Sequence, residues 1–163
     1  MVAALLEHRK SSSSFDDAAE MAPFTSADIH RRSIFTECIH EAERFKWIES
    51  EKAGRDLGEW AIKDWVRHHW WGYLRAKWLE HLQGNTFWIE LDRGDFGLLR
   101  RDFTDHRQLL DQIVELLKDG HENLGVIAWA KRSKVAIEPV IQILEALDIN
   151  SRRLVHQFDG LHN

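Results

Sequence analysis

The stretch from Arg55 to Gln83 limits what this chain can fold into more than any other part of the sequence. It contains neither of the chain's two prolines, so one long helix can run through it, ended by Gly84 as a C-terminal cap. Around such a helix three tryptophans fall within about 20° of one another and form an aromatic stripe: Trp60, Trp71 and Trp78. A second apolar strip lies roughly opposite and contains Ile62, Trp65, Val66, Tyr73 and Ala76. A helix that is apolar on two sides is packed between neighbouring helices or covered by a partner subunit.

The segment before this helix predicts a first long helix from about Ala27 to Lys52, with Ser26 as its N-cap. Its apolar residues collect on one side, which we assign to the core: Ile34, Phe35, Cys38, Ile39, Ala42 and Phe45. Together the two helices make a long Trp-rich helical hairpin. The expected fold class is all-α.

Composition divides the chain into three parts. Residues 1–25 contain a serine run, several acids and few large apolar residues, which predicts a flexible arm. Residues 26–103 hold the hairpin and a short irregular segment, and residues 104–163 form a compact helical module. In the irregular segment one short strand or a single helical turn is predicted by the alternating Phe87, Ile89 and Leu91. The runs ESEKAGRDLGEWAIKDW and WLEHLQG resemble runs in uncharacterised bacterial helical proteins, a resemblance that implies no function.

Aromatic side chains on the second helix suit a helical core or a protein interface, because each ring buries a large area at low entropy cost. The candidate interface residues are Trp60, Trp65, Trp70, Trp71, Tyr73 and Trp78. Stacking of single-stranded bases on the same rings is an alternative. It requires basic residues beside the rings, and only Arg75 lies in the stripe itself.

Two pairs of residues have spacings that suit metal ligands. Asp64 and His68 lie one turn apart within the stripe, so they could share a metal ion or form a buried, hydrogen-bonded structural pair. Glu37 and His40 have the Glu-x-x-His spacing of carboxylate-bridged di-iron bundles. These two, with Glu41, point away from the apolar side of their helix, and no second copy of the motif follows. We therefore expect a solvated charged face here and no bound metal.

Familiar motifs of enzyme active sites are missing from the sequence. Cys38 lies on the apolar face of its helix, where a thiol is inert packing. There is no Gly-x-Ser-x-Gly turn, no glycine-rich phosphate loop and no His-Glu-x-x-His. We expect no catalytic residues, no cofactor and no enzymatic activity.

Net charge and cysteine content limit the partners and the compartment that we expect for this chain. With 22 basic and 27 acidic residues the net charge is −5, which gives no overall attraction to nucleic acid or anionic membrane. The single cysteine excludes an intramolecular disulfide and a cysteine zinc site, and so favours a reducing compartment. The apolar run near the N-terminus is too short for a signal peptide or a membrane span. A cytoplasmic protein without a membrane partner is expected.

The C-terminal part carries the most specific motif. A helix with Thr104 as its cap should end at Asp119 and Gly120. The following segment, LGVIAWAKRSKVAIEPVIQILEAL, resembles the helix-turn-helix of DNA-binding proteins, whose second helix enters the major groove. The matching positions are small Ala130 in the first helix, Val135 after the turn, and Val140 with Ile143 or Leu144 in the second. The chain departs from that family at the turn, where Lys134 replaces the usual glycine.

Charge on this module argues against DNA as the main ligand. The residues available to contact phosphates are Lys131, Arg132, Lys134, Arg152 and Arg153, and Gln142 could contact an adenine edge. The outward face of the second helix, however, carries Glu138, Glu145 and Asp148, which a phosphate-lined groove would repel.

Three functional hypotheses follow in order of preference. The first is a non-catalytic adaptor or assembly subunit that binds a protein partner, or its own copy as a homo-oligomer, through an aromatic helix face. The second is a helix-turn-helix DNA-binding regulator whose hairpin dimerises. The third is a metal-dependent helical-bundle enzyme.

Overall fold

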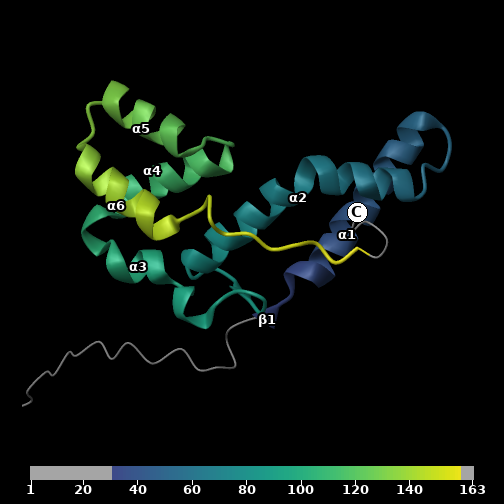
Figure 1. The fold of residues 1–163 in the computed structure, drawn as a ribbon, viewed down its shortest axis with the longest axis horizontal. Coiled ribbons are helices and arrows are strands. Elements are labelled where there is room, and N and C mark those ends of the chain that lie inside the picture. The colour runs from purple at the N-terminus through teal and green to yellow at the C-terminus, as the bar shows by residue number, and fades with distance from the viewer. Residues whose placement is uncertain (1–30, 159–163) are drawn as a thin grey trace, which may run out of the picture.

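The computed structural model describes residues 31–158, and within that range the fold is all-α, as predicted (Figure 1). The arm expected at residues 1–25 and the cap expected at Ser26 lie outside the described residues. Six α-helices account for most of the described chain, and its one sheet consists of two strands of two residues each. None of the helices in this range is both long and apolar enough to cross a membrane.

Helix α1 spans Ile34–Ala53 and begins seven residues later than the sequence predicts. Its N-cap is Ser33, whose hydroxyl accepts a hydrogen bond from the backbone N–H of Thr36 at 3.2 Å. The carboxylate of Glu90 accepts a second bond from the backbone N–H of Ile34 at 2.9 Å, and a third from the hydroxyl of Ser33. The helix cannot start earlier because the two residues before Ser33 are paired in a strand, β1.

Helix α2 spans Glu59–Leu82 and packs against α1 to complete the expected hairpin (Figure 1). It begins four residues later than predicted, because Gly54 and Gly58 in the connection both adopt positive φ, at 64° and 58°. Such backbone is incompatible with an α-helix. The predicted stop at Gly84 is confirmed: its φ is +74°, and a Cβ there would lie 3.1 Å from the Cα of Gly97.

A short parallel pairing closes the base of the hairpin. Strand β1, Arg31–Arg32, pairs with β2, Phe87–Trp88, in the register Arg31 to Phe87 and Arg32 to Trp88. Of the two predicted alternatives, a short strand or a single helical turn, the structure has the strand, but Trp88 enters the core and Ile89 is exposed. The guanidinium of Arg32 and the ammonium of Lys77 lie 5.1 Å and 4.8 Å from the centre of the Trp88 ring.

The C-terminal module contains helices α4 at Arg107–Lys118, α5 at Asn123–Arg132 and α6 at Ile137–Leu147, and the short helix α3 at Leu98–Asp102 lies just before its predicted start (Figure 1). Two 3₁₀ turns, Arg93–Asp95 and Thr104–His106, precede α3 and α4. Thr104 is part of the second turn and does not cap α4, which corrects the sequence expectation. The predicted end of α4 is confirmed, with Asp119 as the cap and Gly120 at φ +91°.

Two clusters of buried residues form the core. The hairpin cluster lies between α1, α2 and β2 and contains Ile34, Cys38, Ala42, Trp65, Trp70, Leu74, Trp88 and Leu91. The module cluster contains Leu79, Leu82, Leu99, Leu110, Ile113, Val114, Leu117, Val126, Ala130, Val140, Ile143, Leu144 and Leu147. Helix α2 contributes to both clusters, so the core of the module extends across the boundary expected between residues 103 and 104.

After α6 the chain runs back along α2 as an extended segment, residues 151–158, which we call the C-terminal strap (Figure 1). Near its start, the guanidinium of Arg152 donates to the carboxylate of Asp95 at 2.7 Å and to the carbonyl of Leu147 at 2.6 Å. The strap then crosses α2 and lies against the hairpin cluster, which Leu154 and Phe158 contact. It thereby connects the module to the hairpin.

Candidate protein interface on the hairpin

The six aromatic residues predicted to form an interface divide into buried and exposed sets. Trp65 and Trp70 belong to the hairpin cluster, and Trp70 is only 2% exposed. Tyr73 is half-buried between the helices, where its hydroxyl donates to the carbonyl of Ile34 at 3.1 Å. These three rings pack on one another, with centroids 5.6 to 6.5 Å apart. Their assignment to an open interface is therefore corrected: α1 and the strap cover their side of α2, so Trp65 and Trp70 are buried and Tyr73 is half-buried in this structure.

The exposed set lies on the other side of α2, as the opposed strips predicted. Trp60 is 60% exposed and Trp71 49% exposed. Asp64 and Arg67 occupy the positions between them, at steps of four, three and four residues that keep all four side chains on one face of the helix. Arg67 therefore lies in the stripe as well as Arg75, which corrects the expectation that Arg75 is the only basic residue there. We call Trp60, Asp64, Arg67 and Trp71 the outward face of α2.

The protein covers the same stripe itself toward the C-terminal end of α2. Trp78 is half-buried, and the guanidinium of Arg152 lies 4.5 Å from the centre of its ring. Arg75 donates to Glu122 at the start of α5 at 2.7 Å, which ties α2 to the module. Arg153 lies 5.1 Å from the ring centre of Trp71, at the border between the covered and open parts. The stripe is thus covered at one end and open at the other.

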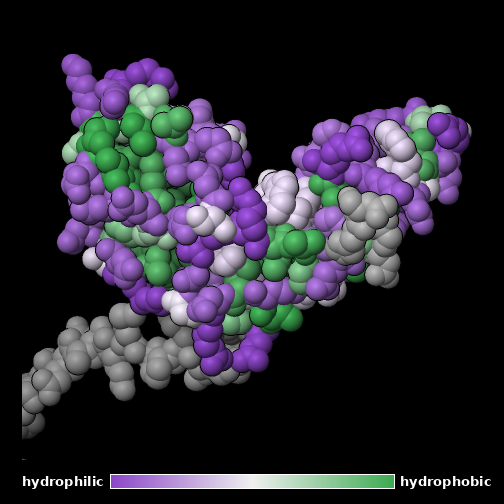
Figure 2. All heavy atoms as spheres, in the orientation of Figure 1, coloured by the Kyte–Doolittle hydropathy of each residue, from purple (hydrophilic) through white to green (hydrophobic). Residues whose placement is uncertain are grey.

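Exposed hydrophobic side chains are not confined to α2. Figure 2 shows hydrophobic residues gathering on the C-terminal module, over α5 and α6, with smaller patches along the hairpin. Leu124 at the start of α5 is 80% exposed. The outward face of α2 differs from these aliphatic surfaces in combining two indole rings with one acid and one base.

The Asp64 and His68 pair lies at the surface and not inside a helix interface. His68 Nδ1 and Asp64 Oδ1 are 3.0 Å apart, and the histidine side chain is 57% exposed. The expectation of a buried pair is therefore wrong, because the stripe around it is open at this end. Within residues 31–158, no three His, Cys, Asp or Glu side chains come together in a way that could hold a metal ion.

The Glu37 and His40 motif lies on a solvated charged face, as its spacing relative to the apolar residues predicts. His40 and Glu41 are exposed, and Glu37 pairs with Arg32. Cys38, one position after Glu37, is buried and its thiol donates to the carbonyl of Phe35 at 3.2 Å. Burial, reinforced by the nearby charge of Glu90, raises the pKa of Cys38 to about 11, so the thiol remains protonated at neutral pH.

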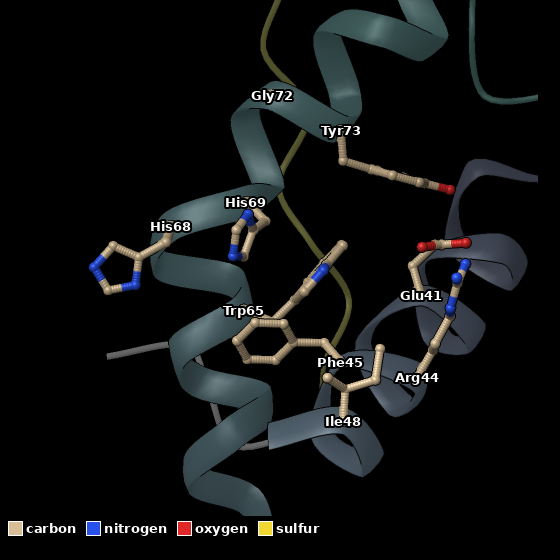
Figure 3. A pocket seen from close by; sticks show the side chains of 9 residues that line it. All are labelled: Glu41, Arg44, Phe45, Ile48, Trp65, His68, His69, Gly72 and Tyr73. Carbon is tan, nitrogen blue, oxygen red and sulfur yellow. The ribbon is translucent and has the colours of Figure 1, made fainter. Parts of the chain in front are cut away.

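A groove that the sequence did not indicate opens between α1 and α2. Its volume is about 440 Å³, and it is lined by Glu41, Arg44, Phe45, Ile48, Trp65, His68, His69, Gly72 and Tyr73. Figure 3 shows Phe45 and Ile48 rising from α1 toward Trp65, with His68 at one rim and Arg44 at the other. The rings of Phe45 and His69 lie 5.2 Å apart. Residues at successive positions, such as His68 and His69, carried no periodic signal that could have placed both beside one groove.

Trp47 on α1 is a second feature that sequence reasoning missed, and it is 65% exposed. It lies beside a depression of about 620 Å³ near the tip of the hairpin, lined also by Glu43, Lys46, Ser50, Glu51, Gly54, Arg55 and Asp56. Trp47 follows Phe45 by two positions, about 200° around the helix, which is outside the core face. That spacing was the available signal.

The residues predicted to contact DNA are only partly free to do so. Lys131, Arg132 and Lys134 are exposed around the turn between α5 and α6. Arg152 is committed to Asp95, which corrects its assignment as a phosphate contact. Arg153 is exposed but lies over Trp71, away from the turn.

Helix α6 has the inward and outward faces that the pattern predicts. Val140, Ile143, Leu144 and Leu147 are buried, while Glu138, Gln142, Glu145 and Asp148 are exposed. The side-chain amide of Gln142 donates to Glu138 at 3.2 Å. Lys134 in the preceding turn adopts φ +57°, the left-handed conformation for which the helix-turn-helix family uses glycine.

No protein-family model matches the chain, and comparison with curated proteins and with solved structures finds no significant match.

Proposed function

We propose that this protein is a non-catalytic adaptor or assembly subunit that binds a protein partner, or a second copy of itself, through the outward face of α2. The observation that carries the proposal is the exposure of Trp60 and Trp71, three turns apart on one face of a helix whose next turns are covered. Exposure of a tryptophan ring to water is energetically unfavourable, and tryptophan is strongly enriched among the hot-spot residues of protein interfaces.

The geometry of the face suits a helical partner. Residues 60, 64, 67 and 71 follow the spacing by which one amphipathic helix meets another. Between the two rings, Asp64 and Arg67 offer one acid and one base, so a partner helix with the opposite charge order would be favoured. Arg75 and Glu122 already make this kind of contact between α2 and α5 within the chain. The partner would continue the covering of α2 that α5 and the strap begin.

Paired double variants test this proposal. Trp60→Ala with Trp71→Ala should abolish self-association in sedimentation experiments, or capture of a specific protein from native lysate, by removing both anchors. The control is Glu41→Ala with Lys63→Ala, which removes two exposed side chains of the same hairpin and should leave assembly unchanged. Lys77 would be a poor control because it packs on Trp88. A wild type that is monomeric and retains the same proteins as the aromatic double variant would refute the proposal.

A second candidate function, DNA binding by a helix-turn-helix regulator, is favoured by one observation. Lys134 holds the left-handed turn conformation between two short helices, and Lys131 and Arg132 are exposed beside it. Each phosphate contact contributes about −0.9 to the slope of log affinity against log salt. Reversal of these charges with Lys131→Glu and Arg132→Glu should weaken binding to every duplex, while Gln142→Ala should weaken only a preferred sequence.

Titration of labelled duplex DNA at low and near-physiological salt separates the two candidates. We expect no binding tighter than micromolar at near-physiological salt, because Glu138 and Glu145 face outward on α6. Salt-sensitive binding that the charge reversals abolish would make the regulator the better proposal.

A further inference from the structure

The C-terminal strap binds α2 in the way that an extended peptide binds a groove. From residue 151 to residue 158 the side chains alternate strictly between exposed and partly buried. This period of two is that of an extended chain with one side on a surface. The partly buried positions are Arg152, Leu154, His156 and Phe158.

Each inward side chain of the strap has its own contact. Arg152 lies on the ring of Trp78, and Leu154 packs into the hairpin cluster. The rings of His156 and Phe158 meet Trp70 and Trp65 edge to face, at 6.0 Å and 6.1 Å. The aromatic surface therefore receives one side chain at every second position of the strap.

The main-chain contact in this groove does not depend on the strap's sequence. The indole N–H of Trp70 donates to the carbonyl of Leu154 at 2.9 Å. Trp70 is almost fully buried, so its N–H needs an acceptor, and any extended chain in this position supplies a carbonyl. A main-chain bond combined with side-chain contacts at alternate positions is the usual basis of extended-peptide recognition.

We propose that the surface formed by Trp65, Trp70 and Trp78 is a peptide-binding groove, filled in this structure by the chain's own strap, whose partner is an extended segment of another protein. The recognised pattern is a cationic residue followed, at steps of two, by an aliphatic and two ring-bearing residues, as in Arg152, Leu154, His156 and Phe158. The inward strap residues contact Trp65, Trp70 and Trp78, and the strap meets the outward face through exposed Arg153 on Trp71. The strap variants leave Arg153, Trp60 and Trp71 unchanged, so either proposal can fail without the other.

The strap also acts as a competitor for this groove. A segment joined directly to the end of α6 has an effective concentration in the millimolar range, so a free peptide of the same sequence binds poorly while the strap is in place. Substitution of the inward strap residues lowers the competition without changing the groove itself.

The test uses the full-length chain and a fluorescein-labelled peptide of residues 150–158, NSRRLVHQF. The variant Leu154→Ala with Phe158→Ala weakens the strap, and the matched control Val155→Ala with Gln157→Ala changes two exposed positions that lie between them. Fluorescence anisotropy should give at least tenfold tighter peptide binding to the first variant than to the wild type or the control. A peptide carrying alanine at positions 154 and 158 should not bind.

Three outcomes would overturn the proposal. One is the absence of saturable binding to a Leu154→Ala, Phe158→Ala variant that keeps the wild-type far-UV circular dichroism. Another is a pair of results: the variant loses the wild-type spectrum, and the strap amides of the wild type exchange hydrogen no faster than the helix amides. The strap would then be an inseparable part of the core. The last is a wild-type dimer that dissociates in this variant but not in the control, which would assign the groove to a second copy of the chain.

Discussion

Acidification should destabilise the protein through His81, which is fully buried at the junction of α2 with the base of the hairpin. Its Nε2–H donates to the carbonyl of Asp92 at 2.8 Å, and its Nδ1 accepts from the backbone N–H of Trp88 at 3.2 Å. Both bonds belong to the neutral ring, and a proton on Nδ1 would break the second. Burial is the main cause that lowers the pKa of His81 below 6.5, against a smaller opposing effect of the bond to Asp92.

The sign and size of the effect follow from linkage. Since the folded state binds the proton more weakly than the unfolded state, stability is complete above pH 6.5 and decreases as the pH falls toward the lowered pKa of His81. Each pH unit in that window costs up to about 1.4 kcal/mol. With a urea dependence of about 1–3 kcal/mol per molar, the unfolding midpoint should fall by up to roughly 0.5–1.4 M per pH unit. Urea titrations followed by tryptophan fluorescence between pH 7.5 and 5.5 measure it.

Two variants isolate the contribution of His81. His81→Gln keeps a donor for the carbonyl of Asp92 and cannot titrate. The variant should be less stable than the wild type at pH 7.5 by about 1–3 kcal/mol, because the buried N–H of Trp88 loses its acceptor. Its stability should vary much less with pH. The control His106→Gln replaces an exposed histidine and should behave as the wild type. An unchanged pH dependence in His81→Gln would refute the assignment.

Further predictions concern the helix ends, the turn and the thiol. Glu90→Ala should destabilise the protein by about 1–3 kcal/mol in urea unfolding, because the N–H of Ile34 and the hydroxyl of Ser33 lose a charged acceptor; an equal effect of Glu90→Gln would show that charge is unimportant. Lys134→Gly should raise stability by about 0.5–1 kcal/mol by relieving the left-handed backbone, and a lower melting temperature would contradict this. Cys38 should react with a thiol reagent only on unfolding, so fast labelling of native protein at pH 8 would disprove its burial.

The long elements could be predicted from the sequence because their apolar periodicity is strong. The inward face of α6 follows the predicted pattern, and glycines end α2 and α4 at the expected places. The predicted core face of α1 is correct except at Ile39, which is 52% exposed because it lies at the edge of that face. The errors lie at helix starts. Gly54 and Gly58 allowed no helix between them. Ser33 caps α1 with its own hydroxyl, and that hydroxyl is bound by the carboxylate of Glu90, 57 residues further along the chain. A contact of that range leaves no local trace in the sequence.

The two apolar strips of α2 were recognised, but which of them faces the core was not. Periodicity gives the angle between the strips, whereas their assignment depends on where α1 and the strap lie. The strap was the more difficult element to foresee. Only eight residues long, it has inward positions that include Arg152 and His156, so it lacks the alternation of apolar and polar residues that marks a strand. The interface residues Trp65 and Trp70 were misassigned for this reason.

Because one uninterrupted helix supplies side chains to both buried clusters, we expect no truncation point that separates the chain into two independently folding parts. Leu74 belongs to the hairpin cluster and Leu79 to the module cluster, only five residues further along α2. A fragment that ends before α2 lacks the helix that contributes to both buried clusters. A fragment that ends within α2 leaves leucines and tryptophans of both clusters exposed. Such pieces would aggregate or adhere to many proteins without specificity. Limited proteolysis should therefore leave a resistant core in which α2 is intact. Partner searches should use the whole chain, because truncated forms would bind proteins nonspecifically through exposed core residues.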